Sequence, residues 1–372
     1  MIVRCVSTAD IRTWHLLSPA LHPARLIVLA CLASLCMLVF AGGCGRSEGA
    51  TEQGSDPGVV NVYTARHYDT DDALYARFTE VTGIRVNLIE ADADQLIARI
   101  EREGDLSPAD VLIVVDAARL HRAEAKSVFS PVASEQLDQL IPTARRHPDG
   151  LWFGLTERVR VIVASNDRVS EDAPNSYEDL ADPRWQGRLL VRSSSNVYNQ
   201  SLVAGMIESI GAEATQAWCE GVVANFARTP QGGDTDQIRA VAAGVGDLAL
   251  VNHYYLARML AGDGADLEAA SGVRVIFPNQ GGRGAHVNIC GAGVVRSAPN
   301  RANAIALLEF LADDEAQAAL AAGNFEYPVK EGVTIVPIVE DFGAFEAEGI
   351  NVSTLGRHNA EAVRVMDRAG WR

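Results

Sequence analysis

Short apolar runs rich in β-branched residues alternate with amphipathic stretches along most of this 372-residue chain. The apolar runs have the length and composition of strands, and the stretches between them show the spacing of helices. Because strand–helix–strand repeats of this length pair in parallel, the pattern predicts an α/β fold. The predicted strands are 59–65, 84–91, 108–115, 187–193, 247–252, 273–279 and 286–295. The predicted helices are 71–83, 94–104, 199–209, 213–226, one from about 254, 302–322 and 359–370.

One apolar segment, WFGLTERVRVIVASN at 152–166, is too long for an ordinary strand. It is long enough to run from one lobe of a protein into another. The chain also has far more residues than one small core needs, so we expect two lobes.

The N-terminus has the pattern of an export signal. Arg25 precedes the apolar run LIVLACLASLCMLVFA, which is shorter than the roughly 20 residues of a membrane-spanning helix. The following AGGC resembles a bacterial lipoprotein cleavage box, with Cys44 as the lipidation candidate, although Ala41 stands where such boxes usually carry Leu. We therefore expect residues 1–43 to be removed and 44–57 to form a flexible tether.

The mature chain is acidic. Removal of residues 1–43 takes away three arginines and one aspartate, so the formal net charge changes from −16 to −18. Such a protein is a poor candidate for binding nucleic acid and a plausible carrier for a cation. Of the cysteines, Cys219 and Cys290 remain besides Cys44, and an exported protein favours a disulfide between them over two buried thiols.

Three polar clusters that contain tyrosine follow predicted strands. Tyr68 lies in the turn of VNVYTARHYDTDD, and Tyr198 lies at the helix start in GRLLVRSSSNVYNQSL. Tyr254 and Tyr255 follow the strand of GDLALVNHYYLAR. Since open α/β sheets bind ligands beyond the carboxyl ends of their strands, we expect these phenols to converge on one target.

Tyrosine favours a particular kind of cation. Zinc and magnesium prefer other ligands, whereas deprotonated phenolate is a hard anionic donor suited to Fe³⁺. Four phenolates exceed a 3+ charge by one unit, and a nearby arginine would offset the excess. If a helix starts at Tyr254, Arg258 lies on the same side of it. His253 stands next to the pair, with its direction left open, and we treat His121 and His286 as structural.

Two other functions compete with a ferric site. The tyrosines would also suit an aromatic cage for a polyamine or another organic cation, and the same fold would suit a small anion. An exported enzyme is the rival from a different class, but the chain has no G-x-S-x-G, H-E-x-x-H, C-x-x-C or P-loop motif. The sequence therefore indicates a binding protein and not an enzyme.

With these segments assembled, the chain resembles the periplasmic ferric-iron-binding proteins of bacterial ABC importers, in their cyanobacterial-type, anion-independent branch. The resemblance runs from about Val59 to Arg372. The motifs that carry it are VNVYTARHYDTD, SPADVLIVVDAARL, DGLWFGLTERVRVI, YEDLADPRWQGRLLVRSSSNVYNQSLVA, NFARTPQGGDTDQI, VNHYYLAR, FPNQGGRGAHVNICGAGV and the closing AGWR.

The resemblance implies a type II, two-lobed and hinged solute-binding protein with a transferrin-like cleft for one Fe³⁺. It implies an N-lobe of 58–156 plus 285–327 and a C-lobe of 157–284 plus 328–372. It also implies a periplasmic monomer that delivers iron to a permease and an ATPase, with contact to the membrane only through a lipid anchor. The implied metal ligands are Tyr68, Tyr198, Tyr254 and Tyr255, with His67 as a conditional ligand, and Arg158 and Arg258 as supporting arginines.

Overall fold

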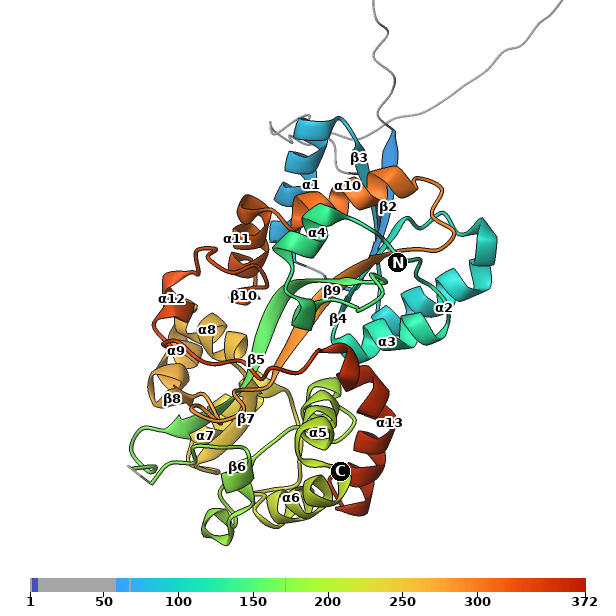
Figure 1. Ribbon diagram of the computed structural model, residues 1–372. Coiled ribbons are helices and arrows are strands. Elements are labelled where there is room, and N and C mark those ends of the chain that lie inside the picture. Colours follow the sequence, from blue (N-terminus) through green and yellow to red (C-terminus); the bar gives the residue numbers. More distant parts are fainter. Residues whose placement is uncertain (1, 6–57, 67, 171) are drawn as a thin grey trace, which may run out of the picture.

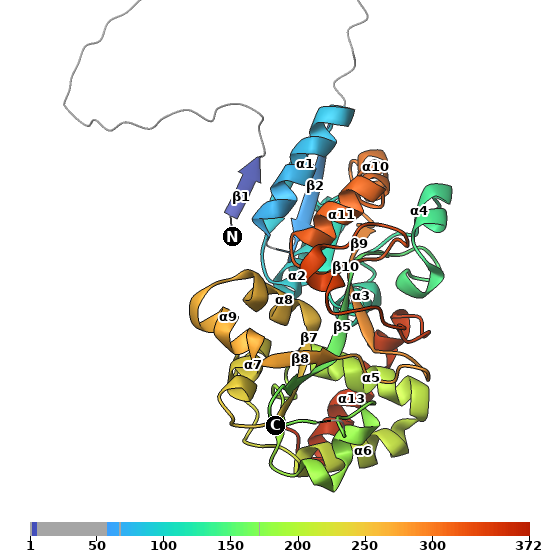
Figure 2. The ribbon, with the colours of Figure 1, turned by 90° about the vertical axis from the view of Figure 1, so that its left-hand side faces the viewer.

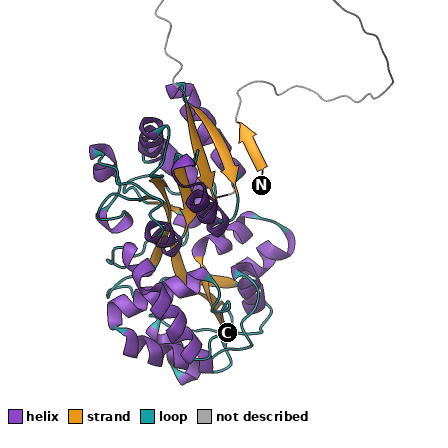
Figure 3. Cartoon of the chain, turned by 90° about the vertical axis from the view of Figure 1, so that its right-hand side faces the viewer, coloured by secondary structure: helices purple, strands orange, loops and turns teal. Residues whose placement is uncertain are grey.

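The computed structural model describes residues 2–5, 58–66, 68–170 and 172–372. Figure 1 shows two groups of helices, one toward each end of the molecule, with long strands running between them. From the side, strands lie through the middle and helices cover them (Figure 3). The fold is a mixed α/β, two-lobed arrangement, as the sequence predicts.

The first lobe contains three parallel strands joined by helices. β2 pairs in parallel with both β3 and β4, which confirms the predicted strand–helix–strand repeats. The strands are β2 (Val59–Thr64), β3 (Arg85–Glu90) and β4 (Val111–Val115). The helices are α1 (Asp69–Thr82), α2 (Ala93–Glu103), α3 (Ala117–Ala125) and α4 (Glu135–Leu140).

Two long antiparallel strands connect this sheet with the second lobe. β5 (Phe153–Ser165) is the long segment that the sequence singles out, and β9 (Val287–Val294) lies between it and β4. The first half of β5 pairs with β9 and the second half with β7 and β8. One unbroken strand therefore belongs to both parts of the sheet (Figure 2).

The second lobe is built on shorter strands and on five helices between β5 and β9. β6 and β7 are parallel, and β7 and β8 are antiparallel to β5. The strands are β6 (Leu189–Leu190), β7 (Leu248–Asn252) and β8 (Val273–Ile276). The helices are α5 (Val197–Ile210), α6 (Ala212–Ala224), α7 (Asp234–Ala242), α8 (His253–Ala261) and α9 (Gly264–Ser271).

The C-terminal part returns to the first lobe and then to the second. The predicted helix at 302–322 is two helices, because Asp313 has an extended backbone. The elements are α10 (Arg301–Leu311), α11 (Asp314–Ala322), β10 (Tyr327–Pro328), α12 (Pro337–Glu340) and α13 (Ser353–Arg368). Short 3₁₀ helices lie at Gly104–Leu106, Thr143–Arg145, Glu178–Ala181 and Pro183–Trp185.

Separate hydrophobic cores stabilise the two lobes. One core joins β2–β4 and β9 with α1, α2, α10 and α11, and two others fill the second lobe on either side of β5 and β7. Val329, Val352 and Leu355 pack in the first core, although they follow residue 327 in the chain. The C-terminal segment therefore crosses between the lobes while keeping contact with both.

The structure bears on two expectations, one about the N-terminus and one about the cysteines. β1 (Ile2–Cys5) pairs antiparallel with β3, whereas Cys44 and the rest of the expected leader and tether lie outside the described residues. No helix in the described ranges is long and apolar enough to cross a membrane.

Cys219 and Cys290 are free thiols, so the expected disulfide is not formed. The reason is their place, since each is buried in the core of a different lobe.

Candidate metal centre

The four predicted tyrosines lie at the starts of three helices. Tyr68 is the residue before α1, directly beyond β2. Tyr198 is the second residue of α5, whose first turn is capped by the side chain of Asn196. Tyr254 and Tyr255 are the second and third residues of α8, which follows β7 without a break. The sequence places all four correctly at strand-to-helix connections.

The structure brings these phenols together. The Tyr254 hydroxyl donates a hydrogen bond of 3.3 Å to the Tyr198 hydroxyl, and the rings of Tyr254 and Tyr255 stack with centroids 4.4 Å apart. The guanidinium carbon of Arg258 lies 5.2 Å, 5.8 Å and 5.5 Å from the ring centroids of Tyr254, Tyr255 and Tyr68. Arg258 therefore touches the rings that come from both lobes.

Asn324 completes this arrangement, and the sequence does not predict it. Its amide donates a 2.7 Å hydrogen bond to the Tyr68 hydroxyl, and its carbonyl oxygen accepts one from Arg258. The residue is fully buried in the turn between α11 and β10. A single asparagine far along the chain from the tyrosines carries no local signal of this contact.

Burial makes these phenols difficult to ionise without a cation. It is the main cause that raises the pKa of Tyr68, and the carboxylate of Glu326 adds to the effect. Burial also raises the pKa of Tyr254, and raises that of Tyr255 to about 12, with further contributions from neighbouring phenols. At neutral pH the three hydroxyls therefore keep their protons until a positive charge replaces them.

Three arginines beside the phenols are paired with carboxylates. Arg66 lies 4.6 Å from the Tyr68 ring, while Arg158 and Arg192 lie 5.4 Å and 5.5 Å from the Tyr198 ring. Their ion pairs are Arg66 with Asp71 at 2.6 Å and Glu326 at 2.9 Å, Arg158 with Asp116 at 3.2 Å, and Arg192 with Asp234 at 3.6 Å.

Arg258 differs from these three arginines. Among the described residues, no carboxylate lies within 4.0 Å of its guanidinium group, and its hydrogen-bond partner is the neutral Asn324. The site therefore contains one positive charge that no carboxylate of the described residues balances at contact distance.

The histidines that the structure describes near the site are not part of the phenol cluster, and the conditional ligand His67 is not among the described residues. The Nδ1 atom of His253 accepts a 3.2 Å hydrogen bond from the Val159 amide, and its ring packs on Tyr327. Burial lowers the pKa of His253 to about 4, so the ring is neutral. His121 and His286 face Glu124 and Glu348 instead, in keeping with structural roles.

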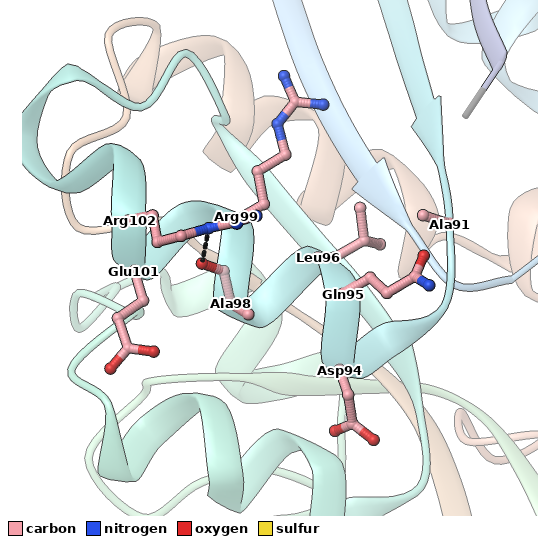
Figure 4. Close-up of a pocket in the computed structure, with 8 residues that line it drawn as sticks. All are labelled: Ala91, Asp94, Gln95, Leu96, Ala98, Arg99, Glu101 and Arg102. Carbon is pink, nitrogen blue, oxygen red and sulfur yellow. Dashed lines mark hydrogen bonds between the residues drawn. The ribbon is translucent and has the colours of Figure 1, made fainter.

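Other features of the described residues offer no competing metal centre. No group of three or more histidine, cysteine, aspartate or glutamate side chains is arranged to hold an ion in the described ranges. A cavity of about 680 Å³ lies along α2, lined by side chains such as Leu96, Arg99 and Glu101 (Figure 4). It is lined by none of the four tyrosines, so the phenol cluster is the candidate site.

The fold and the enclosed site define the class of this protein, a two-lobed solute-binding protein. Comparison with known proteins agrees with this class. Residues 107–341 match the model of the bacterial extracellular solute-binding proteins, and the chain belongs to this family. It is 50% identical over 332 residues to Iron uptake protein A1 of Synechocystis, which covers 88% of this chain and 92% of that protein.

Solved structures show the same architecture. FutA (IdiA) of Trichodesmium, in complex with iron and citrate ligands, matches with a TM-score of 0.83 and 50% identity over 84% of this chain and 100% of its own. Apo FutA2 of Synechocystis matches with a TM-score of 0.81 and 51% identity over 84% of this chain and 99% of its own. The resemblance to the family, stated from the motifs, is confirmed.

Proposed function

We propose that this protein captures Fe³⁺ outside the cytoplasm and delivers it to an ABC importer. The observation that carries the proposal is the convergence of Tyr68, Tyr198, Tyr254 and Tyr255 around Arg258. Relatives that are half identical to this chain are named for iron uptake, and one is solved with iron. The proposed ligands are these four phenolate oxygens, with His67 as a conditional fifth.

The charges of the site support a trivalent ion. Four phenolates around a 3+ ion leave one net negative charge, and Arg258 supplies one positive charge that has no carboxylate partner among the described residues. The starts of α1, α5 and α8 add partial positive charge where the phenolates form, which favours their ionised state. Since the metal must displace the phenol protons, binding releases protons and weakens as the pH falls.

The division of the chain supports capture by closure. We place the N-lobe at 58–156 plus 285–327 and the C-lobe at 157–284 plus 328–372. Tyr68 then comes from the N-lobe and the other three tyrosines from the C-lobe. An ion held by both sets favours the closed arrangement through its differential affinity for that state.

The remaining assignments follow from this role. We propose that the mature protein is periplasmic, with or without a lipid on Cys44, and that it acts as a monomer without enzymatic activity. Its partners would be the permease and ATPase subunits of the importer, which would recognise the closed form.

Equilibrium dialysis of the mature protein tests the cargo. We expect one equivalent of Fe³⁺, offered as its nitrilotriacetate chelate, to be retained, and no retention of spermidine at the same concentration. Tyr63→Phe is the matched control, because Tyr63 is buried in the first core and its hydroxyl hydrogen-bonds to Glu103 of α2 and not to the phenol cluster. Retention of spermidine without Fe³⁺ would contradict the proposal and leave an organic-cation binder of the same fold.

A further inference from the structure

Asn324 connects the two sides of the proposed site. Tyr68 precedes α1 in the first lobe, and Arg258 lies on α8 in the second. The fully buried carboxamide of Asn324 hydrogen-bonds to both, at 2.7 Å to the Tyr68 hydroxyl. It is the direct polar link that the described residues provide between this phenol and this arginine.

The chemistry of the partners fixes which way the amide points. A guanidinium group only donates hydrogen bonds, so the carbonyl oxygen of Asn324 must face Arg258. Its NH₂ group must then face Tyr68, and the phenol oxygen accepts. The orientation therefore follows from the donor inventory and does not depend on the assignment of oxygen and nitrogen positions.

A donor aimed at the phenol oxygen favours the ionised phenol. A neutral phenol can accept this hydrogen bond or do without it, whereas a phenolate gains from every donor that it meets. Arg258, at the other end of the amide, polarises the same group and strengthens its N–H donors. Asn324 thus connects Arg258 to the Tyr68 oxygen through two hydrogen bonds.

The turn that carries Asn324 is held firmly against α1. Phe325 has a left-handed backbone with φ of 56°, which is costly for a residue with a Cβ atom. A Cβ added to Gly323 would lie 2.3 Å from the Thr70 hydroxyl oxygen, so the turn and the start of α1 are in close contact. The amide is therefore placed at a defined position beside Tyr68.

Glu326 anchors the other end of the turn. Its carboxylate accepts a 2.9 Å hydrogen bond from Arg66 and a 2.7 Å hydrogen bond from Thr156, both buried. Because of these contacts, a change at Asn324 alone leaves the backbone of the turn attached to β5 and to the segment before α1.

We propose that Asn324 is a positioning residue of the metal site: its carboxamide holds the Tyr68 hydroxyl in place and links it to Arg258 of the opposite lobe. This inference rests on the proposed function. It adds that the position of one proposed ligand oxygen is set in part by a residue that is not itself a ligand.

Two variants of the full mature protein test the proposal. Asn324→Leu removes the donor and keeps the branched shape of the side chain, while Asn324→Asp keeps a partner for Arg258 but presents an acceptor to Tyr68. We expect both to release Fe³⁺ to a chelator about tenfold faster, in line with the loss of a hydrogen bond to a charged group. The visible absorption band should shift in both variants, because the amide no longer holds the Tyr68 oxygen in place.

The controls separate this inference from the proposed function. Asn166→Leu removes an exposed amide that bonds the Ser271 carbonyl far from the tyrosines, and it should behave as wild type. A wild-type band position and a wild-type rate of iron release in both Asn324 variants would overturn the inference, even with a lowered melting temperature. A wild-type protein without an iron band would instead refute the proposed function itself.

Discussion

At the scale of single residues, the Tyr198 hydroxyl is the simplest test of a ligand. Tyr198→Phe removes the oxygen and keeps the ring, which lies between Arg158 and Arg192. We expect Fe³⁺ affinity to fall by more than about 100-fold, because a lost ligand should exceed the 10- to 100-fold typical of outer partners. Competition with a chelator measures it, and circular dichroism should show an intact fold. An unchanged affinity would exclude Tyr198 as a ligand.

Arg258 tests the charge balance. Arg258→Ala removes the cation that contacts three of the four tyrosine rings without removing a ligand oxygen. Retention of Fe³⁺ should weaken by roughly 10- to 100-fold. Arg258→Lys keeps the charge and should recover part of the loss. Equal retention in the alanine variant and the wild type would show that the excess negative charge is balanced elsewhere.

His253 gives a prediction about stability and pH. Its pKa in the folded protein is about 4, below the ordinary value of 6.5, because burial disfavours the charged ring. A lowered pKa means that the folded state takes up the proton less readily than the unfolded state. The contribution of the neutral His253 ring to the free energy of unfolding is therefore complete above pH 6.5. About 3 kcal/mol of this free energy is lost as the pH falls toward 4.

Urea unfolding of the iron-free protein between pH 4 and 7 measures this contribution. In His253→Gln the difference from wild type should shrink as the pH falls through that range. His358→Gln, on the half-exposed face of α13, is the control. A constant difference in the free energy of unfolding between wild type and His253→Gln across this pH range would contradict the lowered pKa of His253.

At the scale of elements, the start of α3 links the lobes beneath the phenols. Asp116 has a left-handed backbone with φ of 93° and accepts hydrogen bonds of 2.9 Å from Ser201 of α5 and from Asn288 of β9. It also pairs with Arg158 of β5. Asp116 is thus a strained residue that contacts the opposite lobe and both crossing strands. We expect these contacts to stabilise the closed form.

Ser201→Ala tests this stabilisation of the closed form. It removes one interlobe hydrogen bond and leaves Asp116 paired with Arg158 and Asn288, so the cost should be about 1 kcal/mol. If the bond exists only in the closed form, iron release should accelerate about fivefold while the unfolding midpoint changes little. Ser271→Ala, which breaks a bond within α9, is the control. Wild-type release kinetics would show that the contact does not depend on closure.

Periodicity predicts most of the elements, and their exceptions have physical causes. The strands before and after α1 and α2 are near their predicted positions because their apolar runs are short and bounded by turns. The break at Asp313 lies inside a continuous apolar pattern, so periodicity cannot show it. Sheet direction at β9 is also not local, since it depends on which strand lies beside it.

The site shows the same division between local and distant information. The tyrosines can be placed because each lies where a helix starts after a strand. Each of these connections is determined by a short stretch of sequence. Asn324 and Tyr68 are 256 residues apart, and the turn that brings them together is set by the packing of α11 against α1. The number of cysteines favours a bridge between Cys219 and Cys290, whereas their burial in separate cores excludes it.

At the scale of the whole molecule, the two lobes share one sheet but have separate cores. β5 and β9 pass through both lobes, so they can bend as a hinge while the cores stay intact. The proposed iron site lies where helices from both sides meet, and its contacts join Tyr68 and Asn324 to Arg258. The binding of one ion is therefore expected to report on the position of both lobes.

The most direct measurement is a visible absorption titration of the mature protein with chelated Fe³⁺. The account predicts a broad band from phenolate-to-iron charge transfer that saturates at one equivalent and is lost on acidification, as protons return to the tyrosines. A protein that stays colourless and holds no iron would contradict the account.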